Sequence, residues 1–178
     1  MSRAAFAGLA LTACLALGAG CPRPPDTTSQ PSIGPEEKAA ARRTLAAWFE
    51  CEECVDGELQ AVVALGSLGV PTLASTLLRG PSPAALFLVE DRLRARNQEL
   101  HEFAALAPDP FSMLGDDQLV DLYRANYVAR HQGRAAWALG EIGGLEALRA
   151  LRKALGAGLR PDVESGIRAA LERSAGAP

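Results

Sequence analysis

The chain has 178 residues, of which 48% are hydrophobic but only 5% aromatic, and its formal net charge is −3. This length allows one domain with its own core, and that core must be mainly alanine and leucine, which favours close-packed helices over a β-sandwich. Because no run of basic residues is present, composition argues against a nucleic-acid partner and gives no sign of an anionic-membrane partner.

Residues 1–20 are expected to be a lipoprotein signal peptide. Arg3 supplies a short positive region, and Ala4–Leu17 is apolar but too short to span a bilayer as a lasting helix. The stretch ends in Leu-Gly-Ala-Gly-Cys at residues 17–21, which resembles the lipobox of bacterial lipoproteins. The resemblance implies that Cys21 is acylated and becomes the mature N-terminus. An ordinary secretory signal with an incidental cysteine is the alternative.

Residues 21–35 are expected to be a Pro-rich tether. The segment carries five prolines among Ser, Thr, Gln and Asp, so it cannot build a core and should be extended. Such a tether would hold a folded domain off a membrane. Pro22, not Asp, follows the cysteine, and by resemblance to the enterobacterial sorting rule nothing retains the protein at the inner membrane. The predicted location is the periplasmic face of the outer membrane.

Residues 36–174 are expected to form the folded domain, and 175–178 a frayed tail. A first helix is predicted from Pro35 to Glu53, with two acids in its first turn and an apolar face of Ala41, Leu45, Trp48 and Phe49. Helices at 58–68 and 71–79 follow, and Gly80-Pro81 closes this first repeat.

Two longer helices are predicted next. Ser82-Pro83 should cap a helix that runs to about Leu106, with a buried stripe at Leu86, Val89, Leu93, Leu100 and Phe103. Asp116-Asp117 should begin the other, which points Leu119, Leu122, Tyr123 and Tyr127 inward and continues into the next segment, with Gly133 as a possible kink.

The segment from Arg134 to Leu155 shows the clearest helical pattern. Ala135, Ala138, Leu139 and Ile142 form one stripe, Gly143-Gly144 interrupts it, and Leu148, Leu151 and Leu155 resume it. The same register recurs at Ala61, Ala64 and Leu65, and more weakly at Ile167, Ala170 and Leu171. A recurring helix pair predicts an all-α fold, a short α-solenoid of about eight helices.

The run Arg-Ala-Ala-Trp-Ala-Leu-Gly-Glu-Ile-Gly at residues 134–143 resembles the short HEAT-like repeats of the phycobilisome-lyase type. The resemblance implies a non-enzymatic scaffold that binds another protein or peptide, with lyase or hydroxylase chemistry only in branches whose residues this chain does not match. It also implies that Arg134 fixes repeat stacking by pairing with a carboxylate, either Glu141 or Asp162, with contact to a ligand as the alternative.

A small basic patch lies on the predicted second helix of this repeat, at Arg149, Arg152 and Lys153. In solenoids such second helices line the partner-facing surface, so the patch is the candidate binding face, with an ordinary solvated surface as the alternative. The glycine pairs Gly66/Gly69 and Gly140/Gly143 are interpreted as turns between helices. Trp48 and Trp137 are interpreted as core residues.

Cys51 and Cys54 are expected to form a disulfide in an exported protein, since their spacing at a helix end allows one. A thiol-redox pair is the alternative, but the surrounding acids should raise the thiol pKa. A metal site is another, but it would need two more ligands, and His101 and His131 are expected to be solvated surface residues. No catalytic residue and no cofactor is predicted.

Overall fold

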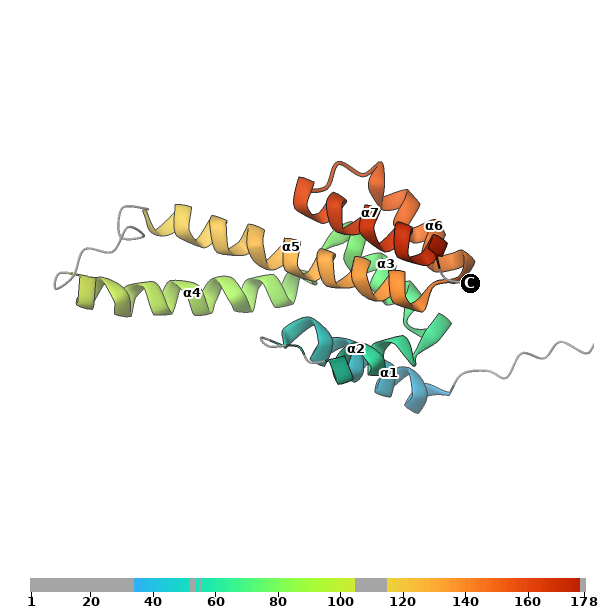
Figure 1. Ribbon diagram of the computed structural model, residues 1–178. Helices are drawn as coiled ribbons and strands as arrows, with labels where there is room; N and C mark the ends of the chain where they lie inside the picture. Colours follow the sequence, from blue (N-terminus) through green and yellow to red (C-terminus); the bar gives the residue numbers. More distant parts are fainter. Residues whose placement is uncertain (1–33, 52–53, 55, 105–114, 177–178) are drawn as a thin grey trace, which may run out of the picture. The chain divides into compact units, whose positions relative to one another are not determined.

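The computed structural model describes residues 34–51, 54, 56–104 and 115–176. The chain divides into two units, Met1–Ser32 and Ile33–Pro178, and the second contains all of these residues. They form seven α-helices and one 3-10 turn, with no strand in the described ranges (Figure 1). The all-α prediction is confirmed, close to the expected eight helices. The elements are α1 (Pro35–Glu50), α2 (Asp56–Val63), η1 (Gly66–Leu68), α3 (Val70–Arg79), α4 (Pro83–Ala104), α5 (Asp116–Ile142), α6 (Gly144–Leu155) and α7 (Pro161–Gly176).

Helix α1 follows its local pattern. Proline stands in its first turn, acids follow at Glu36 and Glu37 where the helix dipole favours them, and all four predicted apolar residues are buried. The helix ends at Glu50, three residues earlier than predicted, because Cys51 adopts an extended backbone conformation.

The first repeat differs from the prediction in register. The expected helix at 58–68 is α2 followed by a turn and η1, and Gly66 has a φ of +52° there. The buried face of α2 consists of Leu59 and Val62, whereas Ala61 and Ala64 are exposed. The proposed equivalence of Ala61 and Ala64 with the buried Ala135 and Ala138 is therefore wrong. The weaker copy in α7 holds better, since Ile167 and Ala170 are fully buried.

Helices α4 and α5 lie side by side (Figure 1) and run antiparallel. Glu90 pairs with Arg124 at 3.0 Å and Arg94 with Asp117 at 3.1 Å, so the numbering falls on one helix as it rises on the other. Helix α4 begins as predicted, because the Ser82 Oγ accepts a hydrogen bond from the Ala85 N–H at 3.2 Å.

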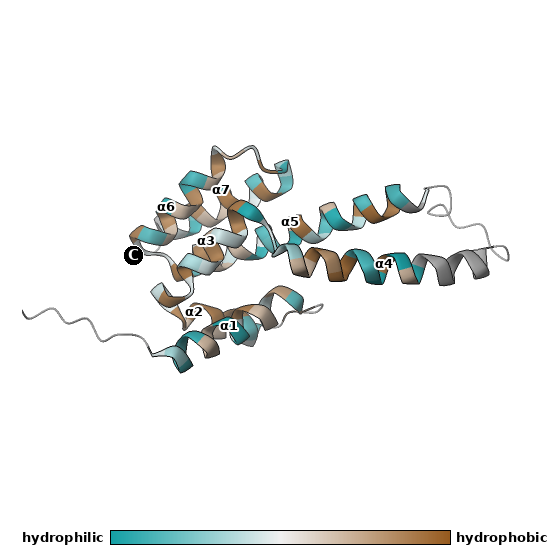
Figure 2. Cartoon of the chain, turned by 180° about the vertical axis from the view of Figure 1, so that it is seen from behind, coloured by the Kyte–Doolittle hydropathy of each residue, from teal (hydrophilic) through white to brown (hydrophobic). Residues whose placement is uncertain are grey.

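The predicted burial along α4 and the start of α5 is met only in part, and on α5 Leu119 and Tyr127 are half-buried. Figure 2 shows hydrophobic residues along the first turns of α4, yet Leu86, Val89 and Leu93 are only half-buried. On α5, Leu122 is 43% and Tyr123 50% exposed. The apolar period predicted the half-buried side of α4 correctly, but α5 is the main helix packed against it, so these side chains are not fully covered. The side chains of Leu100 and Phe103 lie outside the described part of the chain.

Helix α5 continues through Gly133 and ends at Ile142, and the following Gly143 has a φ of +64°, which favours glycine. Gly140 is not a turn residue, contrary to the prediction, since it lies inside α5 where α7 crosses closely. A Cβ built on Gly140 would lie 2.8 Å from the Ala170 Cβ. The Ser174 hydroxyl hydrogen-bonds the Gly140 and Ala170 carbonyls at the same crossing, each at 2.9 Å.

One core joins α1, α2, α3, α5, α6 and α7. Its largest fully buried side chains are Val62, Leu73, Leu77, Leu139, Leu151, Ile167 and Trp48. No single helix in the described ranges has the length and hydropathy to cross a membrane, although Asp56–Val63 and Gly66–Arg79, bent by 90°, pass together as a pair.

Candidate functional site

The predicted basic patch lies on the outer side of α6. Ala147, Leu151 and Ala154 are fully buried and orient the helix, so Arg149, Arg152 and Lys153 on its other side are exposed. Leu145 lies on the same side of α6, four residues before Arg149 and seven before Arg152, and it is 60% exposed. Among the described residues, no carboxylate pairs with these three cations. The patch is therefore a basic surface with one exposed leucine, referred to below as the α6 face.

Cys51 and Cys54 stand where α1 ends and α2 begins, and the structure joins them as a disulfide with Cα atoms 5.4 Å apart. The Cys51 Sγ lies 3.2 Å from the Trp48 carbonyl oxygen, at the negative end of the α1 dipole. This position disfavours a thiolate, which is the reactive form of cysteine. The pair therefore lacks the electrostatic activation that thiol-redox catalysis uses.

A carboxylate of Glu58 lies within 4.8 Å of both sulfurs, and these three residues are the only group of potential metal ligands found in the described ranges. While the two sulfurs are bonded to each other, neither is the thiolate that a metal ion requires. The arrangement could hold a metal ion only after reduction.

Arg134 connects α5 to the end of α1, but not through the predicted carboxylates. Its guanidinium donates to the carbonyl oxygens of Trp48 at 3.1 Å and Phe49 at 2.7 Å. Glu141 pairs with Arg173 and Asp162 with Arg160. Helix ends leave unpaired carbonyls, and a cation is favoured there, so Arg134 acts as a side-chain cap for α1. Burial is the main cause that lowers the pKa of Arg134, and the nearby Glu50 and Glu58 oppose it.

Next to this cap, Glu50 of α1 meets two residues of α5. The Tyr127 hydroxyl donates to the Glu50 Oε1 at 2.5 Å, and the His131 Nε2 lies 3.3 Å from the same oxygen. Burial and the hydrogen bond to Glu50 raise the pKa of Tyr127 well above its ordinary value, so the phenol remains a donor.

His131 is 2% exposed and stacks on Phe49, so the expectation of a solvated surface histidine is wrong. Its Nδ1 lies 3.0 Å from the Tyr127 carbonyl oxygen and its Nε2 faces Glu50. A neutral imidazole has one N–H for these two acceptors, whereas the charged form has two. Burial nevertheless dominates and lowers the pKa of His131, while the acceptors partly oppose it. The side chain of His101 lies outside the described part.

The two tryptophans differ. Trp48 is 1% exposed, and its Nε1 has no hydrogen-bond partner among the residues the structure describes. Trp137 packs edge-on against Trp48, with ring centroids 5.8 Å apart, but it is 44% exposed, so its assignment to the core is wrong. Tyr123, Arg130 and Trp137 recur every seven residues on one side of α5 and are all exposed. The seven-residue spacing could have been found in the sequence, but it does not show whether these side chains are exposed.

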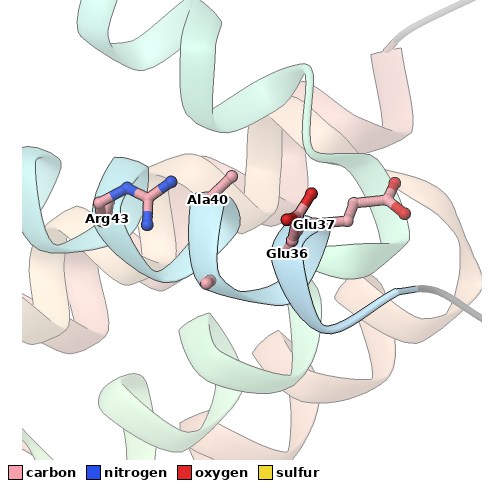
Figure 3. A pocket seen from close by; sticks show the side chains of 5 residues that line it. Glu36, Glu37, Ala40 and Arg43 are labelled. Carbon is pink, nitrogen blue, oxygen red and sulfur yellow. The ribbon is translucent and has the colours of Figure 1, made fainter.

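A shallow depression lies along α1 (Figure 3). It is lined by Glu36, Glu37, Ala39, Ala40 and Arg43, all from this helix. Its lining has acids in the first turn, where they already complement the helix dipole, and one arginine. This arrangement brings together no catalytic set.

Comparison with known proteins finds one family match, near the C-terminal end of the described domain. Residues 132–157 match the family model of the PBS lyase HEAT-like repeat. In this chain the matched residues comprise the last turns of α5 and all of α6. Together with the all-helical fold, this match supports a HEAT-like helical repeat protein. No curated protein and no solved structure matches the chain.

Proposed function

We propose that this protein is a non-enzymatic interaction module that holds a protein or peptide at the bacterial cell envelope through the α6 face. The observation that carries this proposal is the position of the face within the matched repeat. Helix α6 lies inside residues 132–157, and its exposed cations have no ion-pair partner among the described residues. HEAT-like repeats typically serve as binding scaffolds, and their surfaces differ while the helix packing is kept.

The proposed module is anchored by a lipid on Cys21 and reaches from the membrane by the tether at residues 21–35. This part of the proposal rests on the sequence, since both segments lie outside the described residues. Growth with an alkyne-labelled fatty acid should label the full-length protein, and the Cys21→Ser variant should lose both the label and the membrane fraction. Labelling of the variant at the wild-type level would contradict the anchor.

The main test uses photo-crosslinking in intact cells. A crosslinking amino acid is placed at Arg149 or Arg152, or at the exposed Arg42 of α1 as a matched control. A discrete adduct from the α6 positions that is missing from the α1 position would support a binding module with this face. The same adducts from both helices, or none from α6, would contradict it.

The second candidate function is a thiol-redox or metal-linked envelope enzyme that uses Cys51 and Cys54. The cluster with Glu58 favours it, and the position at the α1 C-terminus opposes it. A Cys51→Ser/Cys54→Ser variant separates the two candidates. The module should keep its α6 adducts and lose only stability, whereas the enzyme should lose function while remaining folded.

A further inference from the structure

Positive charge is concentrated in the layer that helices α3 and α6 form. Helices α3 and α6, which pack against each other, together carry four basic residues and one acid, a formal charge of +3. The whole chain is at −3, so everything outside these two helices sums to −6. The basic residues are Arg79, Arg149, Arg152 and Lys153, and all four are exposed. A basic surface on an acidic protein attracts an acidic partner and orients it toward this layer.

Five arginines elsewhere in the described domain are neutralised by a carboxylate: Arg94, Arg124, Arg160, Arg168 and Arg173. On α1, Arg42 and Arg43 have no ion pair among the described residues, but three acids share that helix. On the α6 face, by contrast, Glu146 is the single acid, and no ion pair involves it among the described residues. The cations of this face are thus available to an external carboxylate.

The α6 face also presents an apolar contact. Leu145, Arg149 and Arg152 follow one another at spacings of four and three residues, which places them in one row along the helix. Leu145 begins the row and is 60% exposed. Covering the exposed part of a leucine side chain stabilises a complex by more than an exposed ion pair does. A partner that fits the row therefore combines carboxylates with one apolar side chain at its end.

We infer that the α6 face binds an acidic peptide segment, whose carboxylates pair with Arg149, Arg152 and Lys153 and whose apolar side chain covers Leu145. This inference rests on the proposed function and specifies the chemistry of the partner at the same site. The carboxylates supply orientation and a rapid encounter, and the apolar contact supplies selectivity over other acidic surfaces. The partner approaches the exposed side of α6, opposite the buried Ala147, Leu151 and Ala154.

The test measures binding of the full chain in detergent to fluorescent peptides by anisotropy. The first probe is a short glutamate-rich peptide with one leucine, the second replaces that leucine with alanine, and the third replaces the glutamates with glutamine. The first peptide should bind most tightly, the second more weakly, and the third not measurably. Added salt should weaken the first two, because paired surface charges are screened.

Variants locate the site. Arg149→Glu/Arg152→Glu should lower affinity for the first peptide by about tenfold or more, since it turns attraction into repulsion. The matched control Arg42→Glu/Arg43→Glu changes the net charge equally, on exposed residues of α1, and should keep affinity within about twofold. Leu145→Ala should remove the preference for the leucine peptide while leaving the weaker binding of the alanine peptide. Circular dichroism verifies that each variant is folded.

Several outcomes would overturn the inference. Equal losses from the α1 and α6 variants would show a response to net charge alone. Binding to phosphatidylglycerol vesicles that Arg149→Glu/Arg152→Glu abolishes, without peptide binding, would assign the face to a membrane surface. If the peptides fail while the α6 photo-adducts persist, the interaction module stands and only the acidic chemistry of its partner is wrong.

Discussion

Replacing Gly140 with alanine tests the close crossing of α5 and α7. The added Cβ would lie 2.8 Å from the Ala170 Cβ, 3.1 Å from its Cα and 3.2 Å from its carbonyl oxygen. These atoms belong to the α7 backbone and its first side-chain carbon, so no flexible side chain can rotate away. Forcing an extra methyl group into such a site costs about 1–3 kcal/mol.

The same substitution also has a favourable effect, because alanine is a better helix former than glycine by about 1 kcal/mol. Gly133 isolates that effect. It lies in the same helix, and a Cβ there would meet nothing within 4 Å. Gly133→Ala should therefore stabilise the protein by about 0.5–1 kcal/mol. Gly140→Ala should range from no net change to a loss of about 2 kcal/mol.

Urea unfolding of both variants and the wild type provides the measurement, since the midpoint reports stability when the slope is unchanged. The difference between the two variants isolates the steric cost, expected at about 1–3 kcal/mol. Adding Ala170→Gly should recover part of the loss in Gly140→Ala, because it removes the nearest obstacle. Equal stabilisation by Gly133→Ala and Gly140→Ala would refute the close crossing.

Three further predictions concern the end of α1 and the residues around it. Arg134→Met should cost about 2 kcal/mol in urea unfolding because two carbonyl acceptors lose a charged donor, whereas a loss below about 0.5 kcal/mol would contradict the cap. Since burial lowers the folded-state pKa of His131, the unfolded chain binds the proton more readily, and stability should fall as the pH drops below about 6.5. The His131→Gln variant should show a smaller acid-induced loss between about pH 8 and about pH 5, and an unchanged loss would contradict this assignment. Cys51→Ser/Cys54→Ser should cost about 2 kcal/mol or less because the closed loop is short, and alkylation mass spectrometry that finds both thiols free in exported protein would contradict the disulfide.

Local patterns predicted the elements well. The apolar face of α1, the serine cap of α4 and the break at Gly143 each depend on residues within one or two turns of chain, and each was predicted correctly. Errors arose where the same pattern needs a neighbour. The stripes on α4 and at Tyr123 have helical period, but period alone does not say whether one helix or several will cover them.

The junction of α1 and α5 was not predictable, because its contacts join residues far apart in sequence. Glu50 meets His131, and Arg134 meets the carbonyls of Trp48 and Phe49, across separations of 81 to 86 residues. The histidine has polar neighbours in sequence, which suggested solvent exposure. The resemblance to repeat proteins indicated that Arg134 stabilises stacking, but it suggested a carboxylate partner where the structure has a helix end.

The covered sides of α5 support the proposal that a partner meets the α6 face. Gln132 faces α3 through the Leu77 carbonyl, His131 faces α1, and Gly140 faces α7, so three sides of α5 are covered. Its fourth side carries the exposed stripe of Tyr123, Arg130 and Trp137, with Arg130 at its centre. A symmetric pairing of two copies in register along this stripe would place Arg130 against its own counterpart and would be opposed by like charge. The three unpaired cations of the α6 face likewise oppose a second copy of this face, and they favour an acidic chain.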